Sequence, residues 1–364
     1  MSKLSRRHFL QIAASGIATS LSTSLAFNAH SQPKKKLGVA LVGLGYYSKE
    51  LLAPALELTQ HCELRGIVTG SPSKIPQWQQ RYSIPDKNVY SYDNMHEIAN
   101  NPDIDAIYIV VPTALHLKYC EIAANAGKHV WCEKPMAMTT QQCQQIIDVC
   151  NKNKVQLTVG YRMQHEPNTR TLMEFKHSPP YGKIQSILSQ AGYAGNGMAA
   201  ENWRMKKAMG GGAMYDMGVY PLNGARFLTG LEPIAISARH DKSHPQIFKE
   251  VDETTYFTLE FPEGLMAECA TSMVKGFNQI KLDCEKGWYQ LSPMSEYSGV
   301  TGLTSDGRHF PPIKGLQQAI QMDDDALAIL NKGPILVPGE EGLRDIHVVQ
   351  AAFESAASGK RVLL

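Results

Sequence analysis

Three side chains suited to proton transfer and charge stabilisation stand in two short motifs of this sequence. Lys134 belongs to the tripeptide Glu133-Lys134-Pro135, which follows the apolar segment 129–132. A lysine held at the carboxyl end of a strand donates to a substrate hydroxyl or carbonyl and stabilises the negative charge that develops there. Taken alone, the tripeptide fits a structural ion pair at the start of a helix equally well.

The other two side chains, Asp216 and Tyr220, follow three consecutive glycines, 210–212, in a segment predicted to be helical. Their i, i+4 spacing puts the carboxylate and the phenol on one helix face, with the amide of Asn223 one turn further on. This combination is unusual for a face that packs in a core. An ordinary core tyrosine is the alternative, and a site is favoured because Lys134 could serve it too.

A glycine-rich turn, residues 43–48, lies between the apolar segment 37–42 and a predicted helix. Two glycines allow a tight turn and let backbone N–H groups approach a pyrophosphate at the helix N-terminus. Ser48 stands where a third glycine or alanine is usual, and an ordinary turn is the alternative. The location at the first turn of an alternating chain favours a dinucleotide site. The predicted contacts in this turn are Gly43, Leu44, Gly45 and Tyr46.

The end of the next predicted strand, 62–68, bears on the choice between NAD and NADP. NAD enzymes tend to place an Asp or Glu there for the ribose hydroxyls, and this chain has none. Thr69 and Ser71 can donate hydrogen bonds, and Lys74 can supply positive charge to a 2′-phosphate. The pattern therefore favours NADP, although Lys74 could also be a solvated lysine at a helix start.

Strands and helices alternate through the first part of the chain, which predicts an α/β Rossmann domain with a doubly wound parallel sheet over residues 37–160. The segment 104–111 is almost wholly apolar, as in a strand that is buried on both faces. The further predicted strands are 37–42, 62–68, 129–132 and 155–159, and the predicted helices are 115–126 and 139–151, the latter capped by Thr139 or Thr140.

Longer, alternating strands follow, which predicts an α+β C-terminal domain, 161–364, with a largely antiparallel, open-faced sheet. The predicted strands are 184–190, 234–240, 254–261, 265–273 and 279–285. Because an open sheet face is a liability unless it is covered, we expect a homo-oligomer, a dimer or tetramer, to form through it. The tail is predicted to be helical from Gln317, with a last helix starting at 338–342 and packed back on the first domain.

The N-terminus, Ser5-Arg6-Arg7-His8-Phe9-Leu10, resembles the twin-arginine export signal, which the translocation machinery reads. An apolar segment and the small residues Ser24 and Ala26 follow, so residues 1–26 are predicted to be a signal peptide that directs the protein to the periplasm without a stable membrane anchor. An irregular N-terminal helix is the alternative. That compartment has no NADP pool, which favours a cofactor that is retained and recycled between two substrates.

Charge and cysteine usage exclude other classes of protein. Residues 1–26 carry three basic and no acidic side chains, so their removal would change the net charge from +2 to −1, and nothing suggests nucleic-acid binding. Seven scattered cysteines without a Cys-x-x-Cys pair favour buried free thiols over a disulfide framework. No spacing of Cys or His suggests a metal site.

From about residue 37 to the C-terminus, the motifs together resemble those of the Gfo/Idh/MocA oxidoreductases, and within them the glucose-fructose oxidoreductase branch. Most of the wider family has His where Tyr220 stands, and the tyrosine is similar to that branch. The motifs are Gly43-x-Gly45, Pro112-Thr113-x-x-His116, Glu133-Lys134-Pro135, Gly160-Tyr161-Arg162, Trp203-Arg204, Asp216-x-Gly218-x-Tyr220 and Pro338-Gly339-Glu340-Glu341-Gly342.

The resemblance implies that Lys134 and Tyr220 are a catalytic pair with Asp216 as partner. Tyr220 would take the proton of a sugar hydroxyl while a hydride passes to the nicotinamide. The resemblance also aligns Thr69 and Lys74 with a serine and a lysine that bind NADP in related proteins. Contacts with the cofactor or the sugar are implied for Pro112, Thr113, His116, Glu133, Arg162, Trp203 and Arg204.

One feature of that branch is missing. Glucose-fructose oxidoreductase carries a long proline-rich arm before its first strand, whereas ten residues separate Ala26 from Leu37 here. The resemblance therefore does not extend to an arm that locks the cofactor or joins subunits. An ordinary NAD(P)-dependent sugar or anhydro-sugar dehydrogenase, a glycosidase-like enzyme without net redox, and a sensor remain as alternatives. The loop 192–202 is expected to contribute to sugar recognition.

Overall fold

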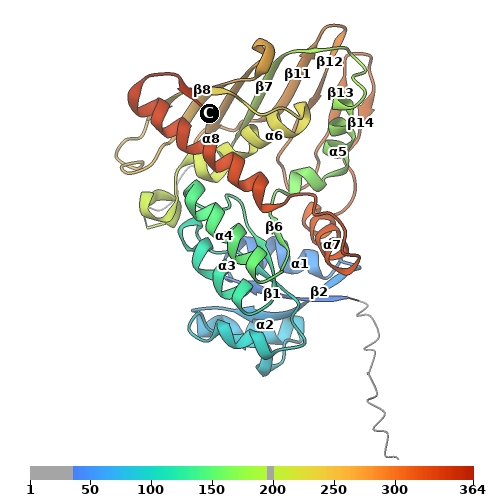
Figure 1. Ribbon diagram of the computed structural model, residues 1–364, viewed down its shortest axis with the longest axis vertical. Coiled ribbons are helices and arrows are strands. Elements are labelled where there is room, and N and C mark those ends of the chain that lie inside the picture. The colour runs from blue at the N-terminus through green and yellow to red at the C-terminus, as the bar shows by residue number, and fades with distance from the viewer. Residues whose placement is uncertain (1–35, 195–200) are drawn as a thin grey trace, which may run out of the picture. The chain divides into compact units, whose positions relative to one another are not determined.

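The computed structural model describes residues 36–194 and 201–364 (Figure 1). The predicted signal peptide, with its cleavage site after Ala26, lies outside the described residues. So do residues 195–200 of the predicted sugar loop 192–202. No helix of the described segments is long and apolar enough to cross a membrane.

The first sheet has six strands in the order β3-β2-β1-β4-β5-β6, and every pair in it is parallel. This confirms the doubly wound sheet. The strand predicted at 104–111 is shorter in the structure, where it spans Ala106–Ile109. The strand β3 was not predicted, because a segment of two residues is too short to show the alternation of a strand. The strands are β1 Leu37–Val42, β2 Cys62–Val68, β3 Val89–Tyr90, β4 Ala106–Ile109, β5 His129–Cys132 and β6 Leu157–Val159.

Helices cover both faces of this sheet, and alternate residues of β1 show it. Val39 and Leu41 belong to one buried apolar cluster, whereas Ala40 and Val42 belong to a second. The second cluster includes α3 and α4, and the first includes α1 and, from the far end of the chain, Met322 of α7. The helices named are α1 Ala53–Leu56, α2 Ile75–Tyr82, α3 His116–Asn125, α4 Thr140–Lys152 and α7 Gln317–Leu330.

The second sheet has nine strands in the order β14-β13-β12-β11-β7-β10-β9-β8-β15. All its pairs are antiparallel except β7 with β10, so the prediction of a largely antiparallel sheet is confirmed. The strands are β7 Ile184–Gly192, β8 Ala235–Asp241, β9 Thr254–Glu260, β10 Met266–Ser272, β11 Asn278–Cys284, β12 Gly287–Leu291, β13 Gly302–Thr304, β14 His309–Phe310 and β15 Val362–Leu363.

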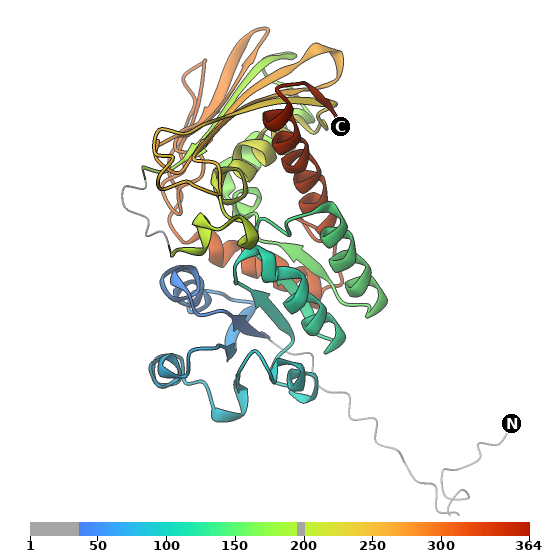
Figure 2. The ribbon, with the colours of Figure 1, turned by 90° about the vertical axis from the view of Figure 1, so that its left-hand side faces the viewer.

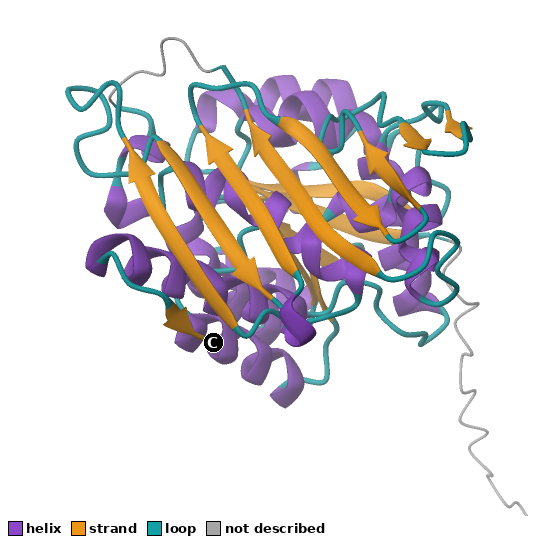
Figure 3. Ribbon diagram, turned by 90° about the horizontal axis from the view of Figure 1, so that it is seen from above, coloured by secondary structure: helices purple, strands orange, loops and turns teal. Residues whose placement is uncertain are grey.

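The two faces of this sheet differ (Figure 3). Cross-strand register aligns one row of neighbours that are all buried, and helices α5, α6 and α8 contact strands of the sheet. The adjacent row points away from the helices and is exposed or half-buried. The buried row is Ile236, Leu259, Ala267, Ile187, Leu282, Tyr289 and Thr304, and the outer row is Ser237, Thr258, Glu268, Leu188, Lys281, Gln290 and Leu303.

The last helix, α8 (Gly339–Ser358), contacts both sheets' layers and lies alongside α4 (Figure 2). Its first turn needs small residues: a Cβ on Gly342 would stand 2.7 Å from Cβ of Met136, which closely follows Lys134. The glycines of the 338–342 motif therefore let α8 approach the segment that carries the lysine. The other helices of this part are α5 Pro167–Met173 and α6 Val219–Thr229.

All seven cysteines are buried and free. Burial raises the pKa of the Cys62 and Cys150 thiols to about 12. Thiols of this kind are poor nucleophiles at neutral pH, since the thiolate is the reactive form.

Asp325 of α7 is buried against β6, with 3% of its surface exposed. One oxygen accepts a hydrogen bond of 3.0 Å from the Thr158 hydroxyl. Burial raises the pKa of Asp325 to about 6, and nearby His165 opposes that shift only in part. A carboxyl whose pKa is higher in the folded state adds stability below its ordinary pKa and loses that contribution as the pH rises through the folded value.

We expect Asp325→Asn to become more stable relative to the wild type as the pH rises from about 4 to about 7, by on the order of 1–3 kcal/mol. The amide keeps the acceptor for Thr158 and carries no charge into the interior. Urea unfolding at several pH values measures the difference. Asp283→Asn, at an exposed ion pair with Lys281, is the control. A difference for Asp325→Asn that does not vary with pH would contradict the prediction.

Candidate active site

The glycine-rich turn has one glycine that the backbone requires and one that faces open space. Gly43 adopts φ +91°, and a Cβ there would stand 2.5 Å from the Val110 carbonyl oxygen. Its N–H donates to Val68, and its carbonyl accepts from the Ser48 hydroxyl. A Cβ on Gly45 would meet nothing within 4 Å. The turn is therefore fixed at Gly43 and open at Gly45, which fits the close approach of a pyrophosphate.

The residues predicted for NADP selection lie beside this turn. The Lys74 ammonium donates a hydrogen bond of 2.7 Å to the Leu44 carbonyl. Thr69 is buried, and its hydroxyl accepts from the N–H of Ser71 at 3.1 Å. Tyr46 is 69% exposed. Lys74 thus holds a positive charge next to the turn and forms no ion pair with a carboxylate of the described residues, and a 2′-phosphate would suit that charge.

The predicted trio comes together from two segments far apart in the sequence. The Lys134 ammonium donates to the Asp216 main-chain carbonyl at 2.6 Å and lies 4.5 Å from the Tyr220 ring centroid. The Arg162 guanidinium lies 5.4 Å from the same ring. Two cations therefore flank one phenol, which is only 5% exposed.

The Asp216 carboxylate faces a different partner from the one expected. One oxygen pairs with the Arg204 guanidinium at 3.1 Å, and the other accepts from the Tyr193 hydroxyl at 3.0 Å. Burial acts to raise the pKa of Asp216, but Arg204 and Lys134 outweigh it and hold that pKa below its usual value. Asp216 therefore contacts Lys134 through its backbone and positions Arg204 through its side chain. Arg204 in turn stacks on Trp203, 4.5 Å from its ring.

Glu133 and Arg162 flank the trio as buried charges. Glu133 accepts from the Tyr108 hydroxyl at 2.7 Å and from the backbone N–H of Lys134 at 3.1 Å. Burial raises the pKa of Glu133, although Lys134 and Tyr108 act against it. Arg162 donates to the Ser295 and Glu296 carbonyls and stacks on Tyr297, 4.7 Å from its ring.

The remaining predicted residues, His116, Thr113 and Pro112, contact segments next to the trio and not Tyr220 itself. His116 is 1% exposed, and its two ring nitrogens lie 3.0 Å from the Pro135 carbonyl and 2.9 Å from the Val111 carbonyl. It therefore braces the segment after Lys134 and does not reach Tyr220. Thr113 is also buried and lies against Gly210, where a Cβ would stand 2.8 Å from it. Pro112, just before Thr113, accepts from the Leu115 N–H in the same turn.

Sequence reasoning missed several residues around the site. Tyr47 and Tyr297 have ring centroids 5.9 Å apart. Tyr193 and Tyr108 bond the two buried carboxylates. Tyr47 and Tyr193 lie within the predicted turn 43–48 and the predicted sugar loop 192–202 but were not named there, whereas Tyr108 and Tyr297 stand outside any motif, so no local signal identified them.

Asn223 does not join the trio. Its amide accepts from Gln164 at 3.0 Å and donates to buried Asp345 at 2.9 Å, so it joins α6 to α8. The helix face that carries Asp216 and Tyr220 begins in a π-helical segment, Met214–Gly218, before α6.

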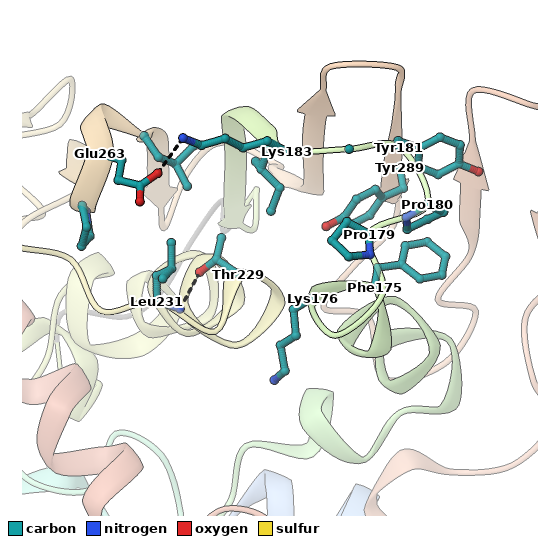
Figure 4. A pocket seen from close by; sticks show the side chains of 14 residues that line it. Phe175, Lys176, Pro179, Pro180, Tyr181, Lys183, Thr229, Leu231, Glu263 and Tyr289 are labelled. Carbon is teal, nitrogen blue, oxygen red and sulfur yellow. Dashed lines mark hydrogen bonds and ion pairs between the residues drawn. The ribbon is translucent and has the colours of Figure 1, made fainter.

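A cavity of about 260 Å³ lies elsewhere in the C-terminal part (Figure 4). Aromatic and proline side chains line it, including Phe175, Tyr181 and Tyr289, and the Lys183–Glu263 ion pair of 2.6 Å lies at its edge. None of the predicted site residues lines this cavity, so the cavity is separate from the site formed by Lys134, Asp216 and Tyr220.

Comparisons with known proteins show the family to which the chain belongs. Residues 37–161 match the family described as "Oxidoreductase family, NAD-binding Rossmann fold", and residues 170–290 match the "GFO/IDH/MocA C-terminal domain". The crystal structure of aldose-aldose oxidoreductase from Caulobacter crescentus is similar at 33% identity and a TM-score of 0.86, over 90% of this chain and 100% of that chain. The chain belongs to the Gfo/Idh/MocA oxidoreductase family. The predicted membership of this family is thereby confirmed. The prediction of an NAD(P)-dependent oxidoreductase that acts on CH–OH groups of sugars is confirmed as well.

Curated relatives in this family are named as sugar dehydrogenases. D-xylose 1-dehydrogenase [NADP(+)] of Haloarcula marismortui is 26% identical in an alignment of 349 positions that covers 89% of this chain and 92% of that protein. D-glucoside 3-dehydrogenase of Escherichia coli is 24% identical in an alignment of 360 positions that covers 90% of this chain and 97% of that protein. The chain thus spans nearly the whole length of these Gfo/Idh/MocA relatives.

The two glycines of the turn give a paired test of dinucleotide binding. Gly45→Ala should keep the melting temperature of the wild type and weaken NADPH binding by about tenfold or more, since the methyl group enters the open space. Gly43→Ala should instead lower the free energy of unfolding by about 1–3 kcal/mol, because alanine is strained at positive φ. NADPH fluorescence and thermal unfolding measure both effects. Unchanged NADPH affinity in Gly45→Ala would argue against a dinucleotide at this turn.

Proposed function

We propose that this protein is an NADP-dependent sugar oxidoreductase that moves a hydride between a CH–OH carbon of a sugar and the nicotinamide. The observation that carries the proposal is the Tyr220 phenol, flanked by the Lys134 ammonium at 4.5 Å and the Arg162 guanidinium at 5.4 Å from its ring. A base that takes a hydroxyl proton needs positive charge nearby to stabilise the anion that forms.

The roles of the residues follow from their contacts. A nicotinamide dinucleotide held at the glycine-rich turn would supply the hydride acceptor for a carbinol carbon and, in the reverse direction, the hydride donor for a carbonyl carbon. Tyr220 takes the hydroxyl proton in the first direction and returns it in the second. Lys134 stabilises negative charge on the phenol and on the sugar oxygen, with one of its N–H donors held by the Asp216 carbonyl. Asp216 and Trp203 orient Arg204 toward the sugar.

Two observations support NADP as the cofactor. Lys74 lies against the glycine-rich turn through its bond to the Leu44 carbonyl, and no acidic residue stands between Thr69 and Lys74. A relative of similar length is named as NADP-dependent. A lysine here is suited to a 2′-phosphate, which an acidic residue would repel.

We further propose that the protein is exported to the periplasm by the twin-arginine pathway with its cofactor bound. The twin-arginine sequence at residues 5–10 supports this, together with the absence of an exchangeable NADP pool outside the cell membrane. The enzyme would then oxidise one sugar and reduce a second, with the cofactor recycled in place. The relative named aldose-aldose oxidoreductase makes aldoses as well as ketoses plausible acceptors.

The deciding experiment uses purified protein without added cofactor. We expect it to carry NADP(H), to gain absorbance at the wavelength of reduced nicotinamide when an aldose is added, and to lose it when an aldose or ketose acceptor follows. Protein without NADP(H), which turns over only with added cofactor, would identify an ordinary sugar dehydrogenase. No absorbance change with any sugar would contradict the proposed function.

Tyr220→Phe tests the base directly. We expect kcat to fall by about 10²- to 10⁴-fold with NADPH affinity retained, since only the proton acceptor is lost. Tyr215→Phe is the matched control, because Tyr215 lies five residues earlier and donates to the Met138 carbonyl at 2.7 Å, outside the trio. Equal losses in both variants would show a packing effect and would remove Tyr220 from this role.

We also propose that two copies of the chain pack through the open face of the second sheet. The outer row there places the apolar Leu188 between Glu268 and Lys281, and no helix in the described part of the chain covers that side (Figure 3). An arginine in place of Leu188, at the centre of this row, would be buried without a partner if two copies packed there, and would prevent such packing. Light scattering should therefore find a dimer or tetramer for the wild type and a smaller species for Leu188→Arg. Ile313→Arg, exposed before α7, is the control, and a monomeric wild type would contradict the proposal.

A further inference from the structure

The buried face of α7 carries polar side chains where apolar ones are usual. Gln317, Gln318, Gln321 and Asp325 are each at most 4% exposed. The same helix packs on the first sheet through Ala319, Met322 and Ala326, which share a buried cluster with Leu41. A helix that covers a sheet normally presents an apolar stripe, so each buried amide needs a reason.

Gln321 is the start of a chain of hydrogen bonds to the active site. Its amide donates to the Tyr108 hydroxyl at 3.0 Å, and Tyr108 donates to Glu133 at 2.7 Å. The second oxygen of Glu133 accepts from the backbone N–H of Lys134 at 3.1 Å. Three steps thus connect α7 to the residue that carries the catalytic ammonium.

The direction of this chain depends on the charge of Glu133. An ionised carboxylate only accepts hydrogen bonds, so the Tyr108 proton must point toward it. The phenol oxygen is then left to accept, and the amide N–H of Gln321 is the donor that it meets. When Glu133 is ionised, each of these donors has an acceptor; a proton on Glu133 makes one of its two oxygens a donor, which competes with the bond from Tyr108 or from the Lys134 N–H.

A second glutamine one turn earlier reaches the other charge that flanks Tyr220. The side-chain oxygen of Gln317 accepts from the Arg162 guanidinium. Gln318, on the same helix, has no hydrogen-bond partner for either side-chain atom among the described residues. The amides of α7 therefore differ among the described residues: Gln317 is paired through both side-chain atoms, Gln321 through its N–H but not its oxygen, and Gln318 through neither.

We infer that Gln321, acting through Tyr108, is a positioning residue that keeps Glu133 ionised and thereby holds Lys134 in place beside Tyr220. The inference rests on the proposed function for its activity readout. α7 then has two roles, because it closes one face of the first sheet and also orients the buried charges of the site.

Several charged or titratable groups face Glu133 from the surrounding elements. They are Lys134, Arg162 of the segment after β6, Tyr108 of β4, Tyr47 of the helix after the glycine-rich turn, and Tyr297 of the loop before β13. Burial raises the pKa of Glu133, and Lys134, Tyr108 and Arg162 oppose this. Removal of the Tyr108 hydroxyl leaves burial less opposed, so Glu133 should take up its proton at a higher pH.

The test compares three substitutions in the full-length protein. Tyr108→Phe should lower kcat by about 10- to 100-fold and Gln321→Met by about threefold to tenfold, with NADPH affinity little changed. The acid limb of the kcat/KM pH profile should move to higher pH in both, and further in Tyr108→Phe. Gln318→Met, equally buried and on the same helix, is the matched control and should leave kcat and the pH profile unchanged.

An infrared titration gives a readout that needs no turnover. The carboxylic acid band assigned to Glu133, by its loss in Glu133→Gln, should appear at higher pH in Tyr108→Phe than in the wild type. A shifted band in a protein that oxidises no sugar would uphold the positioning and refute the proposed function. An active enzyme whose band and acid limb do not move in Tyr108→Phe, or a Gln318→Met that matches Gln321→Met, would overturn the inference.

Discussion

The structure of the site depends on two cations that are held beside one largely buried phenol. Lys134 and Arg162 repel each other, and both lose water when they pack against Tyr220, so each needs fixed partners in the protein. Lys134 has the Asp216 carbonyl, and Arg162 has the Ser295 and Glu296 carbonyls. These acceptors come from the second half of the chain. The two halves must therefore meet before the site has its charges in place.

Carboxylates balance these cations at a distance from the phenol. Glu133 lies behind Lys134, and Asp216 turns its side chain toward Arg204. Neither carboxylate accepts a hydrogen bond from the Lys134 ammonium, which leaves the positive charge beside Tyr220 undiminished by a direct ion pair. A close carboxylate would cancel the field that stabilises a phenolate. The separation of the Lys134 ammonium from the Glu133 and Asp216 carboxylates thus keeps its positive charge available to stabilise a phenolate at Tyr220.

Much of this fold could be predicted because its signals are local. The strands β1 and β4 have apolar sequences throughout, and the alternating period of β7 to β11 indicated the second sheet. Lys134, Tyr220 and the turn at Gly43 stood in short motifs. The contacts of Tyr108 could not be predicted, because Gln321 lies 213 residues away and no period or motif joins them. The Asp216 main-chain carbonyl was not predicted to accept from Lys134 for a related reason. Every residue has a main-chain carbonyl, and only tertiary packing determines which one the lysine meets.

The contribution of α7 to the first sheet has a consequence for how the chain is made. Leu41, Tyr108 and Trp131 lie on the sheet face that α7 closes, in one cluster with Met322 and Ala326. During synthesis these residues emerge from the ribosome long before α7 does, so this apolar face of the nucleotide-binding half is covered only in part, by earlier helices such as α1, until residue 330 has been made. A fragment that ends at residue 160 would leave the part that α7 covers exposed. Such a fragment would be prone to aggregate, and the nascent chain needs a chaperone or its own later segments to cover it.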